Sequence, residues 1–329
     1  MTIVSPDLFV DAVLAYHQTA AIKAAIELDI FSEIAGGTKT ADELAKQTGA
    51  AERGIRILCD YLTIRGHLEK EGNEYRLTPS TAMFLDRNSP SWIGSIVEFL
   101  AAPEMMDSFL SDPTSYVRNG GSIGLAHNAP DHPIWVKFAQ TMAPIRAPVA
   151  TSIACELARW SPHKVLDVAV GHGMFGIAIA RAVPGAEITA VDWQAVLSVA
   201  RENAEAAGVS GRYHTLAGSA FEVDWGSGFD LVLMANFLHQ FDYGTCVALL
   251  RKVRKSLVSN GRAAVVEGLP TEDQVLLATF SFQMLGSTPH GEMYAAREFG
   301  EMGLAAGFAK VCVKSVPSTP QSLIIFEGP

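Results

Sequence analysis

The chain has 329 residues, 49% of them hydrophobic, and a formal net charge of −10 at pH 7. This length suits one large or two ordinary domains with a sizeable core, while the negative charge argues against nucleic acid or an anionic membrane as the main partner. The four cysteines have no paired spacing, the N-terminus has no basic segment ahead of an apolar run, and no apolar run approaches a membrane span. These features predict a cytoplasmic protein with reduced thiols and neither a signal peptide nor a membrane helix.

The chain up to residue 77 predicts three helices and a β-hairpin. The first helix carries an apolar stripe that continues into closely spaced alanines, which suits packing against another helix or a second subunit. Thr40 and Glu43 form a capping box that begins the second helix at Ala41. Apolar and polar side chains alternate along the segments before and after a Gly72-Asn73 turn, as in a β-hairpin. The expected ranges are Asp7–Phe31, Ala41–Thr48 and Ala51–Arg65 for the helices and His67–Leu77 for the hairpin.

Three helices followed by a hairpin are typical of a winged helix, a unit that often binds DNA. Residues 1–90, however, hold more acidic than basic side chains, and Glu52 and Asp60 offset the arginines of the third helix. Because DNA binding relies on a basic surface, we expect this winged helix to serve dimerisation and to cover a substrate.

The middle of the chain is rich in methionine, aromatic residues and proline, and it is predicted to be mainly helical with a loop over Ser115–Pro133. Large apolar side chains at helical spacing usually belong to a core. Methionine and aromatic rings also suit a pocket for flat organic molecules. We expect an acceptor to contact Trp135, Phe138, Met142 and, farther along, Met284.

From about residue 158 strands and helices alternate, which predicts a doubly wound α/β sheet. The last two strands are expected to pair antiparallel at one edge. The expected strands are Val165–Val168, Glu187–Val191, Tyr213–Ala217, Asp230–Met234, Gly261–Glu267, Val311–Ser315 and Ser322–Phe326, and the expected helices are Phe175–Val183, Gln194–Ala207, Tyr243–Val258 and Arg297–Ala306.

The first strand of this sheet ends in a glycine-spaced turn that is typical of nucleotide binding. Val165–Val168 runs into Gly171-His172-Gly173, and a helix follows. Glycines in such a turn let the backbone approach a ligand. The next strand ends about 20 residues later in Asp192, whose carboxylate can accept hydrogen bonds from both hydroxyls of a ribose. His172, inside the turn, either contacts a cofactor or caps the helix.

The turn resembles the first motif of the class I S-adenosylmethionine (SAM)-dependent methyltransferases, D-x-G-x-G-x-G. Asp167, Gly171 and Gly173 match it, and Ala169 stands in place of the first glycine. With the helices, hairpin and sheet in this order, nearly the whole chain is similar to the plant-type small-molecule O-methyltransferases and their bacterial relatives. That family combines an N-terminal winged-helix dimerisation domain with a C-terminal Rossmann-like SAM-binding domain.

The resemblance implies cofactor contacts beyond the turn. Asp192 matches the acid that binds the ribose, and Trp193 follows where an apolar residue packs near the adenine. The run Gly218-Ser219-Ala220-Phe221 matches a G-D-x-F segment, with Ser219 in place of the acid that contacts the adenine amine. The expected cofactor contacts are Asp167, Ala169, Gly171, Gly173, Asp192, Trp193, Ser219, Ala220, Phe221 and Asn236.

The same resemblance places the chemistry at His239. The segment Asn236–Asp242 matches the one that holds the family's catalytic histidine, with Gln240 in place of the usual acid after it. Glu267, at a strand end, and Glu292 match the two acids that flank this histidine. A histidine can take the proton of a phenol or hydroxyl near neutral pH, and a carboxylate can hold its ring in one tautomer.

These patterns predict a SAM-dependent O-methyltransferase that acts on a hydroxyl of a small aromatic or polyketide-like molecule and forms a homodimer. No His, Cys or Asp cluster has the spacing of metal ligands, so we expect no metal. The expected domains are a winged-helix dimerisation domain over 1–90, a helical linker over 91–158 that contributes to the substrate pocket, and the Rossmann-like domain over 159–329. Departures from the family motifs keep open N- or C-methylation and SAM-assisted chemistry without methyl transfer. A ligand-sensing DNA-binding regulator is the alternative from another class.

Overall fold

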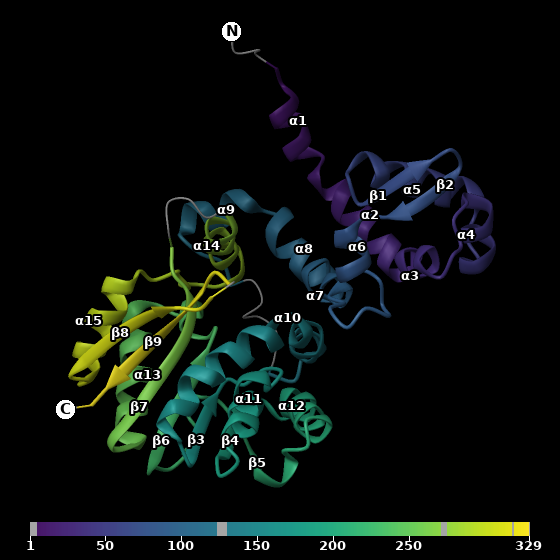
Figure 1. The fold of residues 1–329 in the computed structure, drawn as a ribbon. Helices are drawn as coiled ribbons and strands as arrows, with labels where there is room; N and C mark the ends of the chain where they lie inside the picture. The colour runs from purple at the N-terminus through teal and green to yellow at the C-terminus, as the bar shows by residue number, and fades with distance from the viewer. Residues whose placement is uncertain (1–4, 124–129, 271–274, 318, 329) are drawn as a thin grey trace. The chain divides into compact units, whose positions relative to one another are not determined.

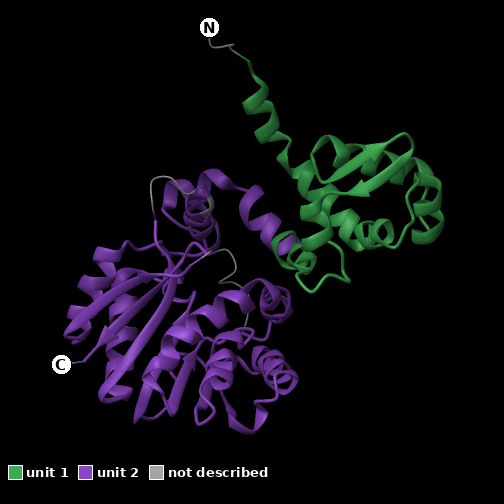
Figure 2. Cartoon of the chain, viewed as in Figure 1, with its two compact units in different colours: residues 1–102 green, residues 103–329 purple. Residues whose placement is uncertain are grey.

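The computed structural model describes residues 5–123, 130–270, 275–317 and 319–328. The chain divides into two compact units, Met1–Ala102 and Pro103–Pro329 (Figure 2). Residues 91–102 lie with the first unit, where Val97 packs against its core. The boundaries at residues 90 and 158 stay a prediction.

The first unit contains the expected second and third helices and the expected hairpin. The capping box of Thr40 and Glu43 is confirmed, and so is the antiparallel hairpin. The elements are α1 Asp7–Val13, α2 Ala15–Glu27, α3 Ile30–Ala35, α4 Ala41–Thr48, α5 Glu52–Ile64, β1 Leu68–Glu71, β2 Glu74–Leu77, α6 Pro79–Phe84, the 3₁₀ turn η1 Gly94–Ile96 and α7 Val97–Leu100 (Figure 1).

The prediction of one helix over Asp7–Phe31 is wrong, because the segment forms α1, α2 and α3. Asp29 adopts a left-handed backbone with φ of 55° between α2 and α3. Aspartate tolerates this conformation better than most residues, and its carboxylate accepts a hydrogen bond from the Ser32 hydroxyl at 2.9 Å. The chain therefore turns at Asp29, and Phe31 enters the core of the unit.

The second unit begins with helices and continues into the α/β sheet. Its long helix α10 contacts α11 and α12. The helices and 3₁₀ turns are α8 Pro103–Leu110, α9 Pro113–Asn119, α10 Pro133–Leu157, η3 Ala158–Trp160, α11 Met174–Ala182, α12 Gln194–Ala206, η4 Ser210–Arg212, η5 Leu238–Gln240, α13 Tyr243–Ser256, α14 Val275–Ser287 and α15 Ala296–Ala306.

The expected loop over Ser115–Pro133 is wrong at its start. Asp112 caps α9 by accepting the Ser115 N–H at 3.1 Å, and Pro113 occupies the first turn, where proline is well tolerated. Helix α14 was not predicted from the sequence. Residues 124–129 of the expected loop lie outside the described residues.

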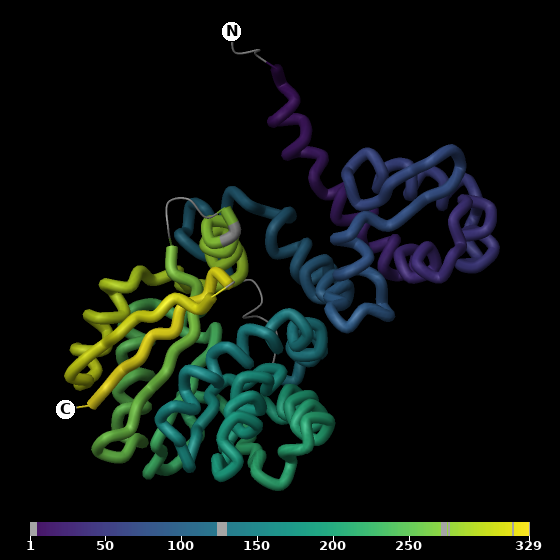
Figure 3. Tube along the Cα trace, viewed as in Figure 1, coloured from purple at the N-terminus to yellow at the C-terminus, as the bar shows by residue number. Residues whose placement is uncertain are grey.

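The sheet of the second unit confirms the doubly wound prediction. Its strand order is β5-β4-β3-β6-β7-β9-β8; the first five strands are parallel, and β9 and β8 add antiparallel at the edge. Figure 3 shows the two C-terminal strands in yellow beside the green β7. The bounds are β3 Lys164–Val168, β4 Glu187–Asp192, β5 Tyr213–Ala217, β6 Phe229–Ala235, β7 Leu257–Gly268, β8 Lys310–Ser315 and β9 Gln321–Glu327.

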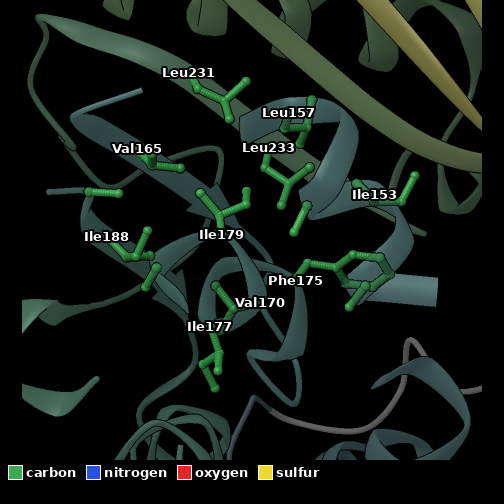
Figure 4. Close-up of a cluster of buried hydrophobic side chains, with 14 of the residues drawn as sticks. Ile153, Leu157, Val165, Val170, Phe175, Ile177, Ile179, Ile188, Leu231 and Leu233 are labelled. Carbon is green, nitrogen blue, oxygen red and sulfur yellow. The ribbon is translucent and has the colours of Figure 1, made fainter. Parts of the chain in front are cut away.

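Two cores sandwich this sheet, because successive strand residues point to opposite faces. Val165 and Leu231 face the core formed with α10, α11 and α12 (Figure 4), whereas Leu166 and Val232 face the core formed with α13 and α15. The order of parallel strands changes direction after β3, at β6. Ligands of such sheets bind at the carboxyl ends of the strands near this point.

Candidate active site

The turn after β3 is organised by Asp192, at the end of β4. The N–H of Gly171 donates to Oδ2 of Asp192 at 2.8 Å, and the N–H of Trp193 donates to Oδ1 at 2.7 Å. Gly173 has a φ of 75°, and a Cβ there would lie 2.6 Å from the Tyr213 hydroxyl. The turn therefore requires glycine at 173 for its backbone conformation and for the space beneath it.

Ala169 occupies the position of the missing motif glycine with a φ of 56°. An alanine in this left-handed region carries strain of about 1–2 kcal/mol. The alanine thus stores strain next to the turn. Such strain is often found at functional sites.

One buried carboxyl, Asp167, and one half-buried carboxyl, Asp192, lie at the turn. Asp167 is 2% exposed, and its Oδ2 accepts the N–H of Gly176 in the first turn of α11 at 3.0 Å. Burial raises the pKa of Asp167 to about 8 and that of Asp192 to about 6. Asp192 also raises the pKa of Asp167, because two nearby negative charges disfavour each other. The contact that the structure shows for Asp167 is with α11, and its role toward a cofactor stays a prediction.

His172 is held as part of the protein scaffold. Its Nδ1 accepts the Met174 N–H at 3.1 Å, and its carbonyl oxygen accepts from the Asn203 side chain at 2.8 Å. Burial, assisted by the charge of Arg146, lowers the pKa of His172 to about 3. Of the two alternatives from the sequence, the structure shows the helix cap, made by a neutral imidazole.

The segment after β5 lies beside Asp192, since the N–H of Gly218 donates to the Asp192 carbonyl at 3.0 Å. The Ser219 hydroxyl accepts the Phe221 N–H at 3.2 Å, so it caps the turn of the segment that contains Ala220. Phe221 is 41% exposed. Ser219, Ala220 and Phe221 are therefore brought to the same edge as Asp192.

Several predicted contacts surround the turn on α10 and α12. Phe138 is the side chain that a Cβ on Gly171 would meet, at 3.6 Å. Trp135 and Trp193 both pack on Val196 and Val199 of α12. Phe138 and Trp135 were expected near the acceptor. The structure puts Phe138 next to the glycine turn and Trp135 against the same small apolar cluster as Trp193.

A buried histidine–carboxylate pair occupies the carboxyl ends of β6 and β7. His239 Nδ1 lies 2.7 Å from Glu267 Oε2, and the backbone N–H of His239 donates to Oε1 at 3.3 Å. The side chains are 7% and 2% exposed. With Nδ1–H donating to the carboxylate, Nε2 carries the free lone pair, and no described residue forms a hydrogen bond with it.

The surroundings of this pair are mainly apolar. Phe280 of α14 sets its ring edge-on to His239, with centroids 4.9 Å apart, and Met284 follows one helical turn later on the same face. Asn236, which leads into the turn before His239, has a φ of 54° and donates its N–H to the Val266 carbonyl at 2.8 Å. Met142 is half-buried on α10.

Glu292 does not share this environment. It is exposed, and its carboxylate forms no ion pair with His239 in the described part of the chain. The neighbouring Gly291 approaches the His239 carbonyl, which would lie 2.5 Å from a Cβ at 291. The part of Glu292 in the chemistry stays a prediction.

Arg146 of α10 was missed by the sequence reasoning. Burial lowers the pKa of its guanidinium, while the charge of Glu267 acts in the opposite direction. Its charge also acts on His172. Arg146 is half-buried, and the described residues offer its guanidinium no hydrogen bond or ion pair, which is costly for a charge partly removed from water. The signal in the sequence was a lone cation within the apolar run 141–153.

Comparison with known proteins identifies the family. An O-methyltransferase domain model matches residues 113–309, and an O-methyltransferase dimerisation domain model matches residues 10–87. The chain belongs to the O-methyltransferase family. It is a SAM-dependent O-methyltransferase with an N-terminal helical dimerisation domain and a catalytic domain of the SAM-methyltransferase fold.

The similarity extends over almost the full length of this methyltransferase. It is 29% identical over 320 residues to 3-hydroxy-5-methyl-1-naphthoate 3-O-methyltransferase of Streptomyces sahachiroi, covering 93% of this chain and 90% of the relative. The solved structure of a candidate O-methyltransferase from Nostoc punctiforme has a TM-score of 0.94 and 45% identity, covering 99% of this chain and 100% of that one. The human N-acetylserotonin methyltransferase in complex with SAM, at 20% identity and a TM-score of 0.84, covers 98% of this chain and 96% of that one, and shares the fold.

Two features of the methyltransferase concern membranes and metals. No helix within the described ranges is long and apolar enough to cross a membrane. Nor do the residues placed by the structure include three His, Cys, Asp or Glu side chains grouped as metal ligands.

Proposed function

We propose that this enzyme methylates a hydroxyl of a small aromatic or polyketide-like molecule, with His239 as the general base. The observation that carries the proposal is the buried 2.7 Å pair of His239 and Glu267. His239 lies in η5, just after β6, and Glu267 lies on β7. Strand β6 is the neighbour of β3, which leads into the glycine turn. The relative from Streptomyces sahachiroi, named for a hydroxynaphthoate, supports an aromatic acceptor.

The residues at the turn fit SAM. Asp192 is fixed by two backbone N–H groups, which leaves its remaining lone pairs for the hydroxyls of a ribose. Gly171 leaves open the space that a side chain would fill. The segment 219–221 lies beside Asp192 at the carboxyl edge of the sheet, where it would contact the adenine. The unpaired guanidinium of Arg146 would meet the carboxylate of the methionyl end, because a half-buried cation without a partner favours an anion there.

When bound, SAM supplies an electrophilic methyl group on its sulfonium sulfur. The chain's own task is to place the acceptor oxygen in line with that methyl group and to exclude water. His239 Nε2 takes the hydroxyl proton as the oxygen–carbon bond forms and the carbon–sulfur bond breaks. Glu267 holds the ring with Nδ1–H toward itself and stabilises the imidazolium that results.

The exposed apolar face of α1 supports a homodimer formed through the first unit. Leu8, Phe9 and Val13 are 86%, 71% and 55% exposed, which is unusual for adjacent apolar side chains of an isolated unit. Because the dimerisation domain model covers residues 10–87, we propose that a second copy covers this face.

Replacement of the base tests the chemistry. His239→Ala should lose most of the turnover, about 10²–10⁴-fold for a general base, while the affinity for S-adenosylhomocysteine (SAH) stays within twofold. The matched control is His214→Ala, because His214 forms an equally short 2.7 Å contact with Glu187 on the exposed surface. Turnover that is unchanged in His239→Ala would refute the assignment of the base.

A further inference from the structure

One lysine binds the backbone carbonyls of the segment Ala220–Val223, which follows β5. Lys252 of α13 donates from Nζ to the carbonyl oxygens of Ala220, Phe221 and Val223, at 2.9, 3.1 and 2.8 Å. Its ammonium also lies 3.9 Å from the centroid of the Trp225 ring. An ammonium has three N–H donors, so these three carbonyls use all of them.

The segment is folded so that its carbonyls converge on this cation. The carbonyl oxygen of Ser219 accepts the N–H groups of Glu222 and Val223 at 3.1 and 2.9 Å, which closes a single helical turn. The carbonyls at the end of such a turn have no partner within it and favour a positive charge. Lys252 supplies that charge and fixes the backbone of the segment through these three carbonyls.

The ring of Phe221 is fixed as well. It meets the ring of Phe241 edge-on, with centroids 5.0 Å apart, and the ring of Phe237 at 6.3 Å. Phe221 is thus held through its carbonyl by Lys252 and through its ring by the segment after β6. Its exposed fraction of 41% leaves part of the ring open to a ligand.

The position of the segment connects Lys252 to the cofactor. Strand β5 is the neighbour of β4, whose last residue is Asp192. A nucleoside whose ribose is bound by Asp192 can extend its base over β5 and the segment that follows. This step rests on the proposed function.

We propose that Lys252 is a positioning residue for the cofactor: it fixes the segment Ala220–Val223 so that the groups facing the adenine are in place before SAM binds. Without it, the segment would have to be ordered at the moment of binding, and the cost would appear as lost affinity. The ribose contacts at Asp192 would stay intact. The hydrogen-bonded pair of the general base His239 and Glu267 would also stay intact.

A second lysine provides a matched control. Lys164 Nζ donates to the Ser227 carbonyl at 2.8 Å and lies 4.7 Å from the centroid of the Phe229 ring. It therefore holds the same connection between β5 and β6, also beside an aromatic ring. It does so from the first residue of β3, at the amino end of the strand and away from Asp192.

The experiment compares Lys252→Met and Lys164→Met in the full chain by calorimetric titration. Two probes are used, SAH and 5′-methylthioadenosine, which share the adenine and the ribose but differ in the methionyl end. We expect Lys252→Met to weaken both probes by the same factor, about tenfold, and Lys164→Met to leave both within twofold. Lys252→Gln, which keeps two of the donors, should give an intermediate loss, and it replaces the methionine variant if that variant does not fold.

Three results would overturn the proposal. The first is binding of both probes within twofold of wild type in the Lys252 variants. The second is an equal loss in Lys164→Met, which would reveal a general effect on stability. The third is a loss confined to SAH, which would place the effect at the methionyl end. A wild-type protein that binds neither probe would instead overturn the proposed cofactor site, and this role with it.

Discussion

Removing the charge of Glu267 is the sharpest test of the proposed chemistry. Glu267→Gln keeps the shape of the side chain but leaves one oxygen where the structure uses two, one for His239 Nδ1 at 2.7 Å and one for the His239 N–H at 3.3 Å. One of these two donors therefore loses its acceptor. The negative charge that would face the imidazolium is lost as well.

The size of the effect follows from the geometry. Opposite unit charges 2.7 Å apart attract by about 6 kcal/mol at an effective dielectric constant of ~20. The amide retains one hydrogen bond, so we expect about half of this energy to be lost from the transition state. A loss of about 3–4 kcal/mol corresponds to a decrease in kcat of about 10²–10³-fold.

The assay is transfer of a labelled methyl group from SAM to an acceptor selected from a panel of hydroxylated naphthoates and related phenols. SAH affinity is measured in parallel. We expect it to stay within twofold of wild type, because Glu267 lies on β7, which β6 separates from β3 and its glycine turn. The control is Glu187→Gln, which makes the same change in the surface pair with His214, where the side chains are 51% and 60% exposed. An exposed pair of this kind is worth about 0–1 kcal/mol. If Glu267→Gln kept a kcat within threefold of wild type, Glu267 would not act through His239 in the reaction.

Four further predictions concern the cofactor edge and the first unit. Ala169→Gly should raise the free energy of unfolding in urea by up to about 1 kcal/mol, since relief of a positive φ exceeds the entropy that glycine adds to the unfolded chain; a less stable variant would contradict the assigned strain. SAH affinity should fall as the pH decreases through about 6, where protonation of Asp192 removes an acceptor from the ribose, and titration of Asp192→Asn should show weak binding without this pH dependence. Arg146→Met should weaken SAH by about 10-fold or more, as expected for a hydrogen bond to a charged group, but leave 5′-methylthioadenosine unchanged; equal losses for both probes would exclude the methionyl carboxylate as its partner. Phe9→Asp should shift the enzyme from dimer to monomer in analytical ultracentrifugation, and an unchanged sedimentation coefficient would exclude α1 from the interface.

Local sequence patterns were sufficient to locate the strand ends that form the site. The glycine turn, Asp192 and the segment with His239 each follow an apolar strand, so their place at the carboxyl edge of the sheet can be inferred from neighbouring residues. The pairing of His239 with Glu267 spans 28 positions in the chain. It was anticipated through the family resemblance, in which Glu267 matches an acid that flanks the catalytic histidine.

The side chains that helices bring to the site could not be found in this way. Arg146 precedes the glycine turn by a long segment and reaches the site only because α10 packs on α11 and α12. Lys252 is a surface-type residue in the sequence, and its three carbonyl partners lie about 30 positions earlier. Similarly, the break of the first helix at Asp29 depends on a single residue in a left-handed conformation, which periodicity does not reveal.

The raised pKa of Asp167 also predicts that SAM and SAH differ in the number of protons released when they bind. Asp167 has a pKa of about 8 in the free enzyme, so it is mostly protonated at pH 7. Its folded pKa, like that of Asp192, lies above the unfolded value of 3.8. The folded free enzyme therefore binds more protons than the unfolded chain, and its stability falls as the pH rises from about 4 to 8.

We expect a bound sulfonium cation to act against this preference at Asp167, because a nearby positive charge favours the carboxylate. Binding of SAM at pH 7 should therefore release more protons than binding of SAH, which lacks the sulfonium charge. The release is measured by calorimetry in two buffers of different ionisation enthalpy, and the difference between the two ligands should disappear in Asp167→Asn. An equal release for SAM and SAH in the wild-type enzyme would show that the sulfonium does not act on Asp167. Asp167 would then serve α11 alone, through its hydrogen bond from Gly176.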